Sequence, residues 1–176
     1  MPTSPRENMT DSTDGRLYAD RLQLHPIGPE SAVDLSTGGA GGFRWVADGP
    51  YEGTRDACTM AAKAAQAGVF APRWGVYAMV RTEDGAAVGG IGFHGPPSEG
   101  TVEIGYDLAA SQRGRGYATE AVAVISAFAL DQPEVDVVVA HTEPGNTASQ
   151  AVVARAGFAR DGEGEDGLFR FVLRHG

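Results

Sequence analysis

The stretch SQRGRGYATEAV, Ser111–Val122, lies between a strand-like run and a helix-like run. The first amides of a helix have no partner within it, and the helix dipole makes that end positive. Gly114 and Gly116 would let a ligand approach the backbone closely, and Arg113 and Arg115 add positive charge. The stretch therefore predicts a diphosphate site. The alternative from these residues alone is a flexible hinge before a helix.

Two common phosphate-binding motifs do not fit this stretch. The dinucleotide fingerprint G-x-G-x-x-G requires a third glycine at the position of Thr119. A P-loop requires a Lys-Ser or Lys-Thr pair after its last glycine, and none follows here. The predicted ligand is therefore neither a nicotinamide dinucleotide nor the triphosphate of a P-loop enzyme.

The rest of the chain is predicted to form strands and helices around one sheet. The run VDVVVAHT at 135–142 is apolar on both faces, which is typical of a buried central strand. Thr54 is the expected N-cap of an alanine-rich helix, and Asn146 is the expected N-cap of a short later helix. The order predicts an α/β fold in which a mixed sheet carries helices on its faces. Strands are predicted at 16–25, 74–82, 86–94, 101–108 and 135–142 and on either side of 162–167, and helices at 54–68, 117–130 and 147–156.

Length and composition predict a single domain over residues 16–176. The polar residues 1–15 are expected to be a disordered tail rather than a signal peptide. No apolar run approaches the roughly 18 residues of a membrane span. A net charge of −9 argues against nucleic acid as a partner, and the single Cys58 permits no internal disulfide framework. We therefore expect a cytoplasmic protein.

The sequence RGRGYATEA, preceded by VEIGYDL, resembles the signature of the GNAT superfamily of acetyl-CoA-dependent N-acetyltransferases. Arg113, Gly116 and Ala118 match its pattern Arg/Gln-x-x-Gly-x-Gly/Ala. The segment NTASQAVVARAGF at 146–158 resembles a second block of the family, in the expected order and spacing. The resemblance covers roughly residues 16–174 and is closest to the branch with acetyltransferases of ribosomal-protein N-terminal alanine or serine. It implies a mostly antiparallel central sheet flanked by helices.

The resemblance implies acetyl-CoA as a cosubstrate. Loop amides would hold the coenzyme A pyrophosphate, and the strand ending at Leu108 would pair with the pantetheine amides. A backbone N–H near Leu108 would contact the thioester carbonyl. No metal is expected, because His25 and His94 have no partner at a metal-ligand spacing. The residues that would bind the cofactor are Tyr106, Leu108, Arg113, Gly114, Arg115, Gly116, Tyr117, Ala118, Thr119 and Asn146.

Acetyl transfer to an amine requires loss of an amine proton, a polarised carbonyl and stabilisation of the leaving thiolate. Glu103, on the strand before the loop, is the candidate base implied by the resemblance, with Tyr106 and Asp107 as fallback candidates. Ser149 is the candidate for a hydrogen bond to the cofactor sulfur. Many family members place a tyrosine as general acid seven residues after the asparagine, where this chain has Val153. The alternatives are an exposed strand residue for Glu103 and a capping or solvent-facing hydroxyl for Ser149.

The acceptor stays open between a protein N-terminus and a small-molecule amine. Family members shape the acceptor pocket in the region of Trp45 and Tyr51 and with the 54–68 helix. His141 and Cys58 are expected to be structural. The resemblance allows a homodimer. Two further hypotheses are a coenzyme A-binding sensor or interaction domain without catalysis, and a structural module that binds no cofactor.

Overall fold

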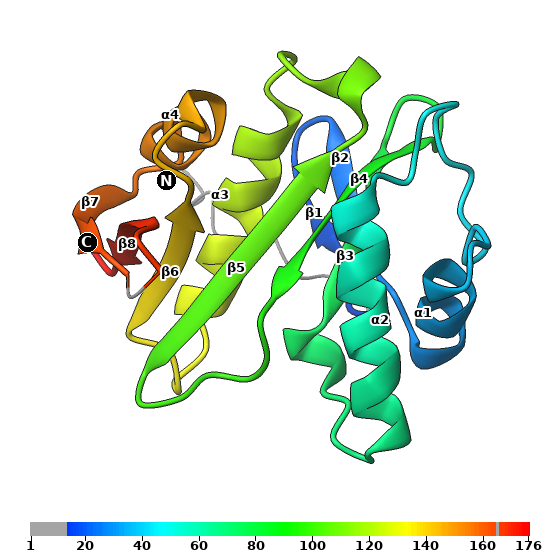
Figure 1. Ribbon diagram of the computed structural model, residues 1–176, viewed down its shortest axis with the longest axis horizontal. Coiled ribbons are helices and arrows are strands. Elements are labelled where there is room, and N and C mark those ends of the chain that lie inside the picture. Colours follow the sequence, from blue (N-terminus) through cyan, green and yellow to red (C-terminus); the bar gives the residue numbers. More distant parts are fainter. Residues whose placement is uncertain (1–13, 165) are drawn as a thin grey trace, which may run out of the picture.

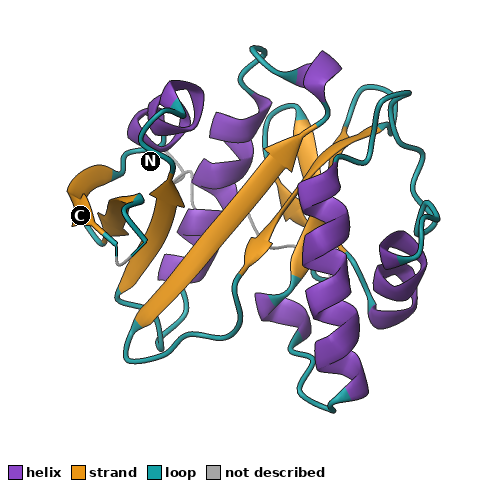
Figure 2. Cartoon of the chain, in the orientation of Figure 1, coloured by secondary structure: helices purple, strands orange, loops and turns teal. Residues whose placement is uncertain are grey.

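The computed structural model describes residues 14–164 and 166–176, which are built around an eight-stranded sheet (Figure 1, Figure 2). The strand order is β1-β2-β3-β4-β5-β6-β8-β7, and neighbours are antiparallel except β5 and β6, which are parallel. The predicted mixed, mostly antiparallel class is confirmed. The predicted tail over 1–15 lies outside the described residues except for Asp14 and Gly15. The strands are β1 Leu17–Tyr18, β2 Leu22–Pro26, β3 Val76–Arg81, β4 Ala87–Phe93, β5 Thr101–Leu108, β6 Val137–Thr142, β7 Ala159–Glu163 and β8 Phe169–Arg174, and the α-helices are α1 Pro29–Ser36, α2 Glu52–Gln66, α3 Tyr117–Leu130 and α4 Thr147–Arg155.

Helices cover both faces of the sheet. On one face, Cys58 of α2 belongs to a buried apolar cluster with Ala78 of β3. On the other face, Val122 and Ile125 of α3 belong to a larger cluster with Ile104 of β5. Figure 1 shows α2 in front of the sheet and α3 behind it. Any side chain on β5 therefore faces either the α2 side or the α3 side.

The N-cap predictions had different outcomes at the two helices. Asn146 caps α4 as predicted, since its Oδ1 accepts a hydrogen bond from the Ser149 backbone N–H at 3.0 Å. The prediction that Thr54 caps α2 is wrong, because the helix begins at Glu52 with Tyr51 at its N-cap. The Thr54 backbone N–H and hydroxyl both donate to the Asp107 carboxylate on β5. The Thr54 hydroxyl, whose oxygen would accept from a helix N–H in an N-cap, instead donates to a residue far away in the sequence.

Other boundaries differ where the chain turns. Helix α1 was not predicted. Pro29 occupies its first turn, where a missing N–H costs nothing. The strand predicted over 16–25 is two strands, separated by a bend after Tyr18. Strand β6 begins at Val137 rather than at Val135, because the Val135 N–H donates to Gln132 in a turn.

The two parallel strands separate before β5 ends. Their register runs only from the pair Thr101 and Val137 to the pair Ile104 and Ala140. Strand β5 continues to Leu108 and pairs there with β4 alone. The β6-side edge of the last four residues of β5 is therefore open for a ligand or another element.

Helix α2 lies close to the sheet because Gly90 of β4 has no side chain. A Cβ at Gly90 would lie 2.5 Å from Oγ1 of Thr54. Thr54 cannot turn away without losing its hydrogen bond to Asp107. The close contact between α2 and β4 therefore requires glycine at this position.

Gly90→Ala is expected to destabilise the fold by about 1–3 kcal/mol, the usual cost of overpacking. Urea unfolding measures the change. Gly145→Ala is the control, because a Cβ there meets nothing within 4 Å. Equal stability of both variants would contradict the prediction.

Candidate active site

A cavity of about 540 Å³ lies between the end of β5, the start of α3 and one side of α4. We call it the β5–α4 cavity. The β5 residues that line it belong to the part of the strand that is not paired with β6. Nine predicted site residues line it: Tyr106, Leu108, Arg113, Gly114, Gly116, Ala118, Thr119, Asn146 and Ser149. The remaining walls are Asp107, Ala148, Ala151, Val152 and Arg155.

Two residues predicted to bind the cofactor do not line this cavity. Tyr117 is buried in the core, where the Arg21 guanidinium lies 4.6 Å from the centre of its ring. Arg115 is exposed. Arg155, which was not predicted, adds a positive charge to the cavity from the last turn of α4. Its only sequence signal was a basic residue near the end of a short helix.

The loop before α3 has the backbone geometry of an anion site. Gly114 and Gly116 have φ angles of 76° and 86°, in the left-handed region that favours glycine. Gly116 is the N-cap of α3, and no side chain caps that helix. The first amides of α3 and the helix dipole therefore provide partial positive charge beside the guanidinium of Arg113.

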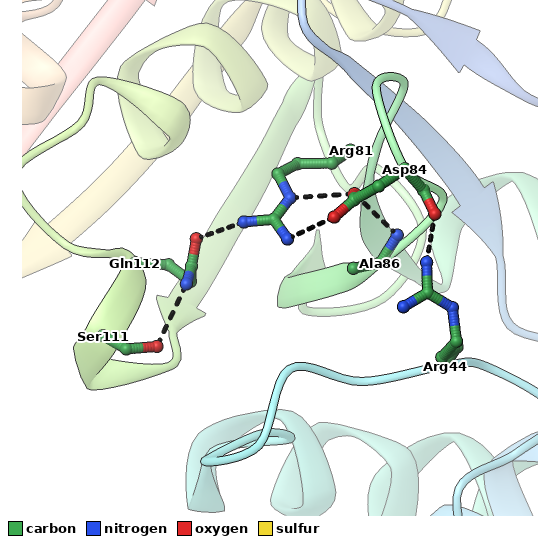
Figure 3. A network of polar contacts seen from close by, with 6 residues as sticks. All are labelled: Arg44, Arg81, Asp84, Ala86, Ser111 and Gln112. Carbon is green, nitrogen blue, oxygen red and sulfur yellow. Dashed lines mark hydrogen bonds and ion pairs between the residues drawn. The ribbon is translucent and has the colours of Figure 1, made fainter.

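A network of side chains braces this loop from the β3–β4 hairpin (Figure 3). Gln112 is buried, and its Oε1 accepts a hydrogen bond from Nη1 of Arg81 at 2.9 Å. Its Nε2 donates to Oγ of Ser111 at 3.1 Å. Arg81 is fixed in turn by the Asp84 carboxylate, and Asp48 accepts from the Ser111 N–H and hydroxyl. The loop conformation is thus held by contacts that are far apart in the sequence.

Tyr106 crosses the gap between β5 and α4. Its hydroxyl lies 2.6 Å from Oγ of Ser149 and 3.3 Å from the Ser149 carbonyl oxygen. Burial raises the pKa of Tyr106, so the phenol stays protonated at neutral pH. The pair places two exchangeable hydroxyl protons at the wall of the β5–α4 cavity.

A second cavity, of about 230 Å³, lies on the α2 side of the sheet. We call it the β4–α2 cavity. Three glycines, Gly90, Gly92 and Gly105, form much of its floor, and His94 lies at its edge. It shares Tyr106 and Asp107 with the β5–α4 cavity. Both cavities therefore adjoin the open end of β5.

Asp107 ties β5 to the first turn of α2. One carboxylate oxygen accepts from the Thr54 N–H at 2.9 Å, and the other accepts from the Thr54 hydroxyl. Burial raises the pKa of Asp107, and the hydrogen bonds from Thr54 oppose that change. Its lone pairs are largely engaged in holding the fold.

Glu103 lies between two histidines. Its Oε1 is 2.7 Å from Nδ1 of His141 and 3.4 Å from Nδ1 of His94. Hydrogen bonding to His94, and after it to His141, lowers the pKa of Glu103 to about 2 against the burial of the carboxylate. The same contact raises the pKa of His94. Reasoning from the sequence considered all three residues but did not bring them together, because they lie on three different segments.

Three further expectations concern the described residues. No group of three or more His, Cys, Asp and Glu side chains among them is arranged to hold a metal ion. None of the helices described is long and apolar enough to span a membrane. Cys58 is fully buried, as expected, and burial raises the pKa of its thiol to about 11.

Comparison with known proteins places this arrangement in a family. Residues 21–159 match the family described as "Acetyltransferase (GNAT) domain". The chain belongs to this GNAT acetyltransferase family. The family resemblance inferred from the motifs is confirmed.

Relatives and solved structures agree with this assignment. YdaF of Bacillus subtilis (strain 168), whose name describes a candidate ribosomal N-acetyltransferase, is 32% identical over 93 residues, or 52% of this chain and 51% of YdaF. The chain spans about half the length of the curated relatives that it matches. An acetyltransferase from Agrobacterium tumefaciens str. C58 aligns with a TM-score of 0.64 and 25% identity, over 97% of this chain and 99% of that chain. AAC(6')-Ib, solved with paromomycin and acetyl-CoA, shares the fold with a TM-score of 0.61 and 20% identity, over 89% and 94% of the two chains.

Glu103→Gln is expected to lower the free energy of unfolding most between about pH 4.5 and 6.5. The pKa of Glu103 falls from 4.5 to about 2 on folding, so its contribution is present above pH 4.5 and is lost as the pH falls toward 2. The pKa of His94 is raised above 6.5, so its contribution is full below pH 6.5 and is lost as the pH rises through the raised value. With a third of the Glu103 side chain exposed, solvent screening limits the loss to about 1 kcal/mol.

Urea unfolding of both proteins at about pH 5.5 and about pH 9 measures this difference. A loss of the same size at both pH values would contradict the assigned pairing between Glu103 and His94.

Proposed function

We propose that the protein is an acetyl-CoA-dependent N-acetyltransferase that acetylates a primary amine by direct attack in a ternary complex. The observation that supports this most is that the β5–α4 and β4–α2 cavities share Tyr106 and Asp107 as wall residues. A donor in one cavity and an amine in the other would come together at the open end of β5. Cys58, the only cysteine, is buried and lines neither cavity, so no cysteine acyl-enzyme is needed.

The β5–α4 cavity offers what coenzyme A requires. The diphosphate of coenzyme A would accept hydrogen bonds from the amides at the start of α3. It would also pair with the positive charges of Arg113 and Arg155. Its pantetheine amides would pair with the open edge of β5 before Leu108. AAC(6')-Ib, which has the same fold, was solved with acetyl-CoA bound. The proposed cofactor-binding residues are those named from the sequence that line this cavity: Tyr106, Leu108, Arg113, Gly114, Gly116, Ala118, Thr119 and Asn146.

Two hydroxyl groups would stabilise or protonate the leaving sulfur. Val153, which stands where many relatives have a tyrosine, is fully buried in α4 and has no proton to give. Tyr106 supplies a phenol from β5 instead, in hydrogen bond with Ser149. We assign Ser149 and Tyr106 together to stabilising or protonating the thiolate.

The acceptor side favours a cationic amine. The wall of the β4–α2 cavity carries Asp107, and Glu103 lies next to His94 at its edge. Carboxylates beside a small cavity attract an ammonium group. Both a protein N-terminus and a small-molecule amine belong to this class, and the names of YdaF and of the paromomycin complex of AAC(6')-Ib support it.

Gly116→Val is expected to abolish coenzyme A binding while the fold survives. A side chain at φ 86° is strained, and its Cβ would lie 3.1 Å from Nη2 of Arg21, so the loop backbone that presents its amides to the phosphate would have to shift. Calorimetry measures binding, and thermal unfolding at about 100 times Kd should show about 2.7 kcal/mol of stabilisation in the native protein but not in Gly116→Val. Gly68→Val is the matched control, because Gly68 also has a positive φ of 73° and lines neither cavity. Loss of binding in both variants would point to general strain instead.

Release of free thiol from acetyl-CoA across a panel of primary amines tests the reaction, with mass spectrometry of the acetylated product. Glu103→Gln should lower kcat by about a hundredfold with little change in coenzyme A affinity, as for loss of a group on which proton transfer depends. Glu134→Gln, at an exposed loop residue, should leave kcat unchanged. Coenzyme A binding without turnover of any amine would replace the proposal with a non-catalytic binding domain.

A further inference from the structure

We propose that Nε2 of His94 accepts the proton from the amine, and that Glu103 is a positioning residue that orients the His94 ring. This inference rests on the acetyltransferase function proposed above. It changes which atom takes the proton, and it assigns a role to a residue that sequence reasoning had considered only as a metal ligand.

The His94 ring lies over β5 at the edge of the β4–α2 cavity, with 57% of its side chain exposed. His94 follows the last residue of β4 and lines the β4–α2 cavity. A Cβ at Gly105 would lie 2.6 Å from Nε2 of His94, so the ring occupies space that only glycine leaves free. Gly105 immediately precedes Tyr106, the residue that lines both cavities, and one strand residue rises about 3.4 Å. Nε2 of His94 therefore lies over β5 about one residue before Tyr106, where an amine bound in the β4–α2 cavity could reach it directly or through one water.

The carboxylate of Glu103 decides which nitrogen of His94 is basic. An ionised carboxylate only accepts hydrogen bonds, so the Nδ1 atoms that face it carry the hydrogens. In His94 this leaves Nε2 as the free lone pair. Glu103 itself is held by two donors at one oxygen, and its pKa of about 2 makes it a weak proton acceptor near neutral pH.

Among the described residues that line the β4–α2 cavity, His94 is the histidine available to accept the proton. His141 contacts the same oxygen of Glu103, but it lines neither cavity, and its Nε2 faces Gly164, where a Cβ would lie 3.2 Å away. Glu103 lines neither cavity, and Asp107, the carboxylate in the wall of the β4–α2 cavity, is bonded to Thr54. Helix α2 and strand β3 contribute only uncharged residues to the cavity wall.

The proton balance of the step is simple. The ammonium gives one proton to Nε2 of His94, and the nitrogen lone pair attacks the acetyl carbonyl carbon. The C–N bond forms, the C–S bond breaks, and its electron pair stays on sulfur. The nitrogen loses its second proton as the amide forms, and the thiolate takes up one proton to become the free thiol. His94 returns its proton to solvent, so each turnover releases one proton net.

The dependence of kcat/KM on pH tests the proposal with an amine that stays protonated over the range. The wild type should lose activity on acidification with an apparent pKa above 6.5, the ordinary value for histidine. His94→Gln should lower kcat/KM by about a hundredfold or more and remove this acidic limb. Glu103→Gln should keep the limb but shift it to lower pH, because the charge that raises the His94 pKa is gone. His141→Gln, the matched control, should retain the limb.

Each outcome decides for or against the assignment. A limb that survives in His94→Gln and disappears in His141→Gln would transfer the role to His141 and overturn the proposal. A Glu103→Gln limb that does not move would overturn the positioning role. Added imidazole should restore part of the turnover of His94→Ala, and no restoration would count against proton acceptance.

A measurement without substrate separates this inference from the proposed function. NMR titration of the His94 ring protons should give a pKa above 6.5 in the wild type and a lower one in Glu103→Gln. If no amine is acetylated while this titration behaves as expected, the acetyltransferase function fails and the Glu103–His94 contact stands. If amines are acetylated and the His94 titration is unaffected by Glu103→Gln, the inference alone fails.

Discussion

Strand β5 keeps its pairing with β6 only as far as Ile104, and the site depends on this separation. Parallel neighbours cannot be joined by a tight turn, so the chain must cross over through α3 between them. The crossover places the glycine loop and the open amides of α3 at the end of β5. Helix α4, which follows β6, forms the opposite wall of the cavity. An open strand edge, a helix N-terminus and a second helix thus meet at one place.

The β4–α2 cavity depends on three glycines, which have no side chain to fill it. Gly90, Gly92 and Gly105 leave a floor on the α2 side of the sheet where other residues would fill the space. The absence of a Cβ at Gly105 is also what lets the His94 ring lie across β5. Tyr106 then points to the other side and reaches Ser149. Alternation along one strand therefore turns Gly105 and Tyr106 to opposite faces of β5, toward the proposed acceptor side and the proposed cofactor side.

Local patterns predicted the parts of the fold that local physics controls. The spans of β5 and α3 agree with prediction, and Asn146 caps α4 because the cap needs only a partner three residues away. Thr54 was mistaken for a cap because its acceptor, Asp107, lies on strand β5, 53 residues away in the sequence. Gln112 was passed over within the decisive stretch, because its partner Arg81 comes from a hairpin 31 residues earlier.

The sequence by itself determined the family, the fold class and the loop that begins α3, because glycines, a helix start and strand alternation act over a few neighbouring residues. Only the tertiary structure decided the chemistry around Glu103. Strand β5 pairs with β4 on one side and with β6 on the other, so the ends of these strands bring His94 and His141 to one carboxylate oxygen. The pKa values of Glu103 and His94 depend on distances and burial across separate segments, and no spacing along the chain encodes them.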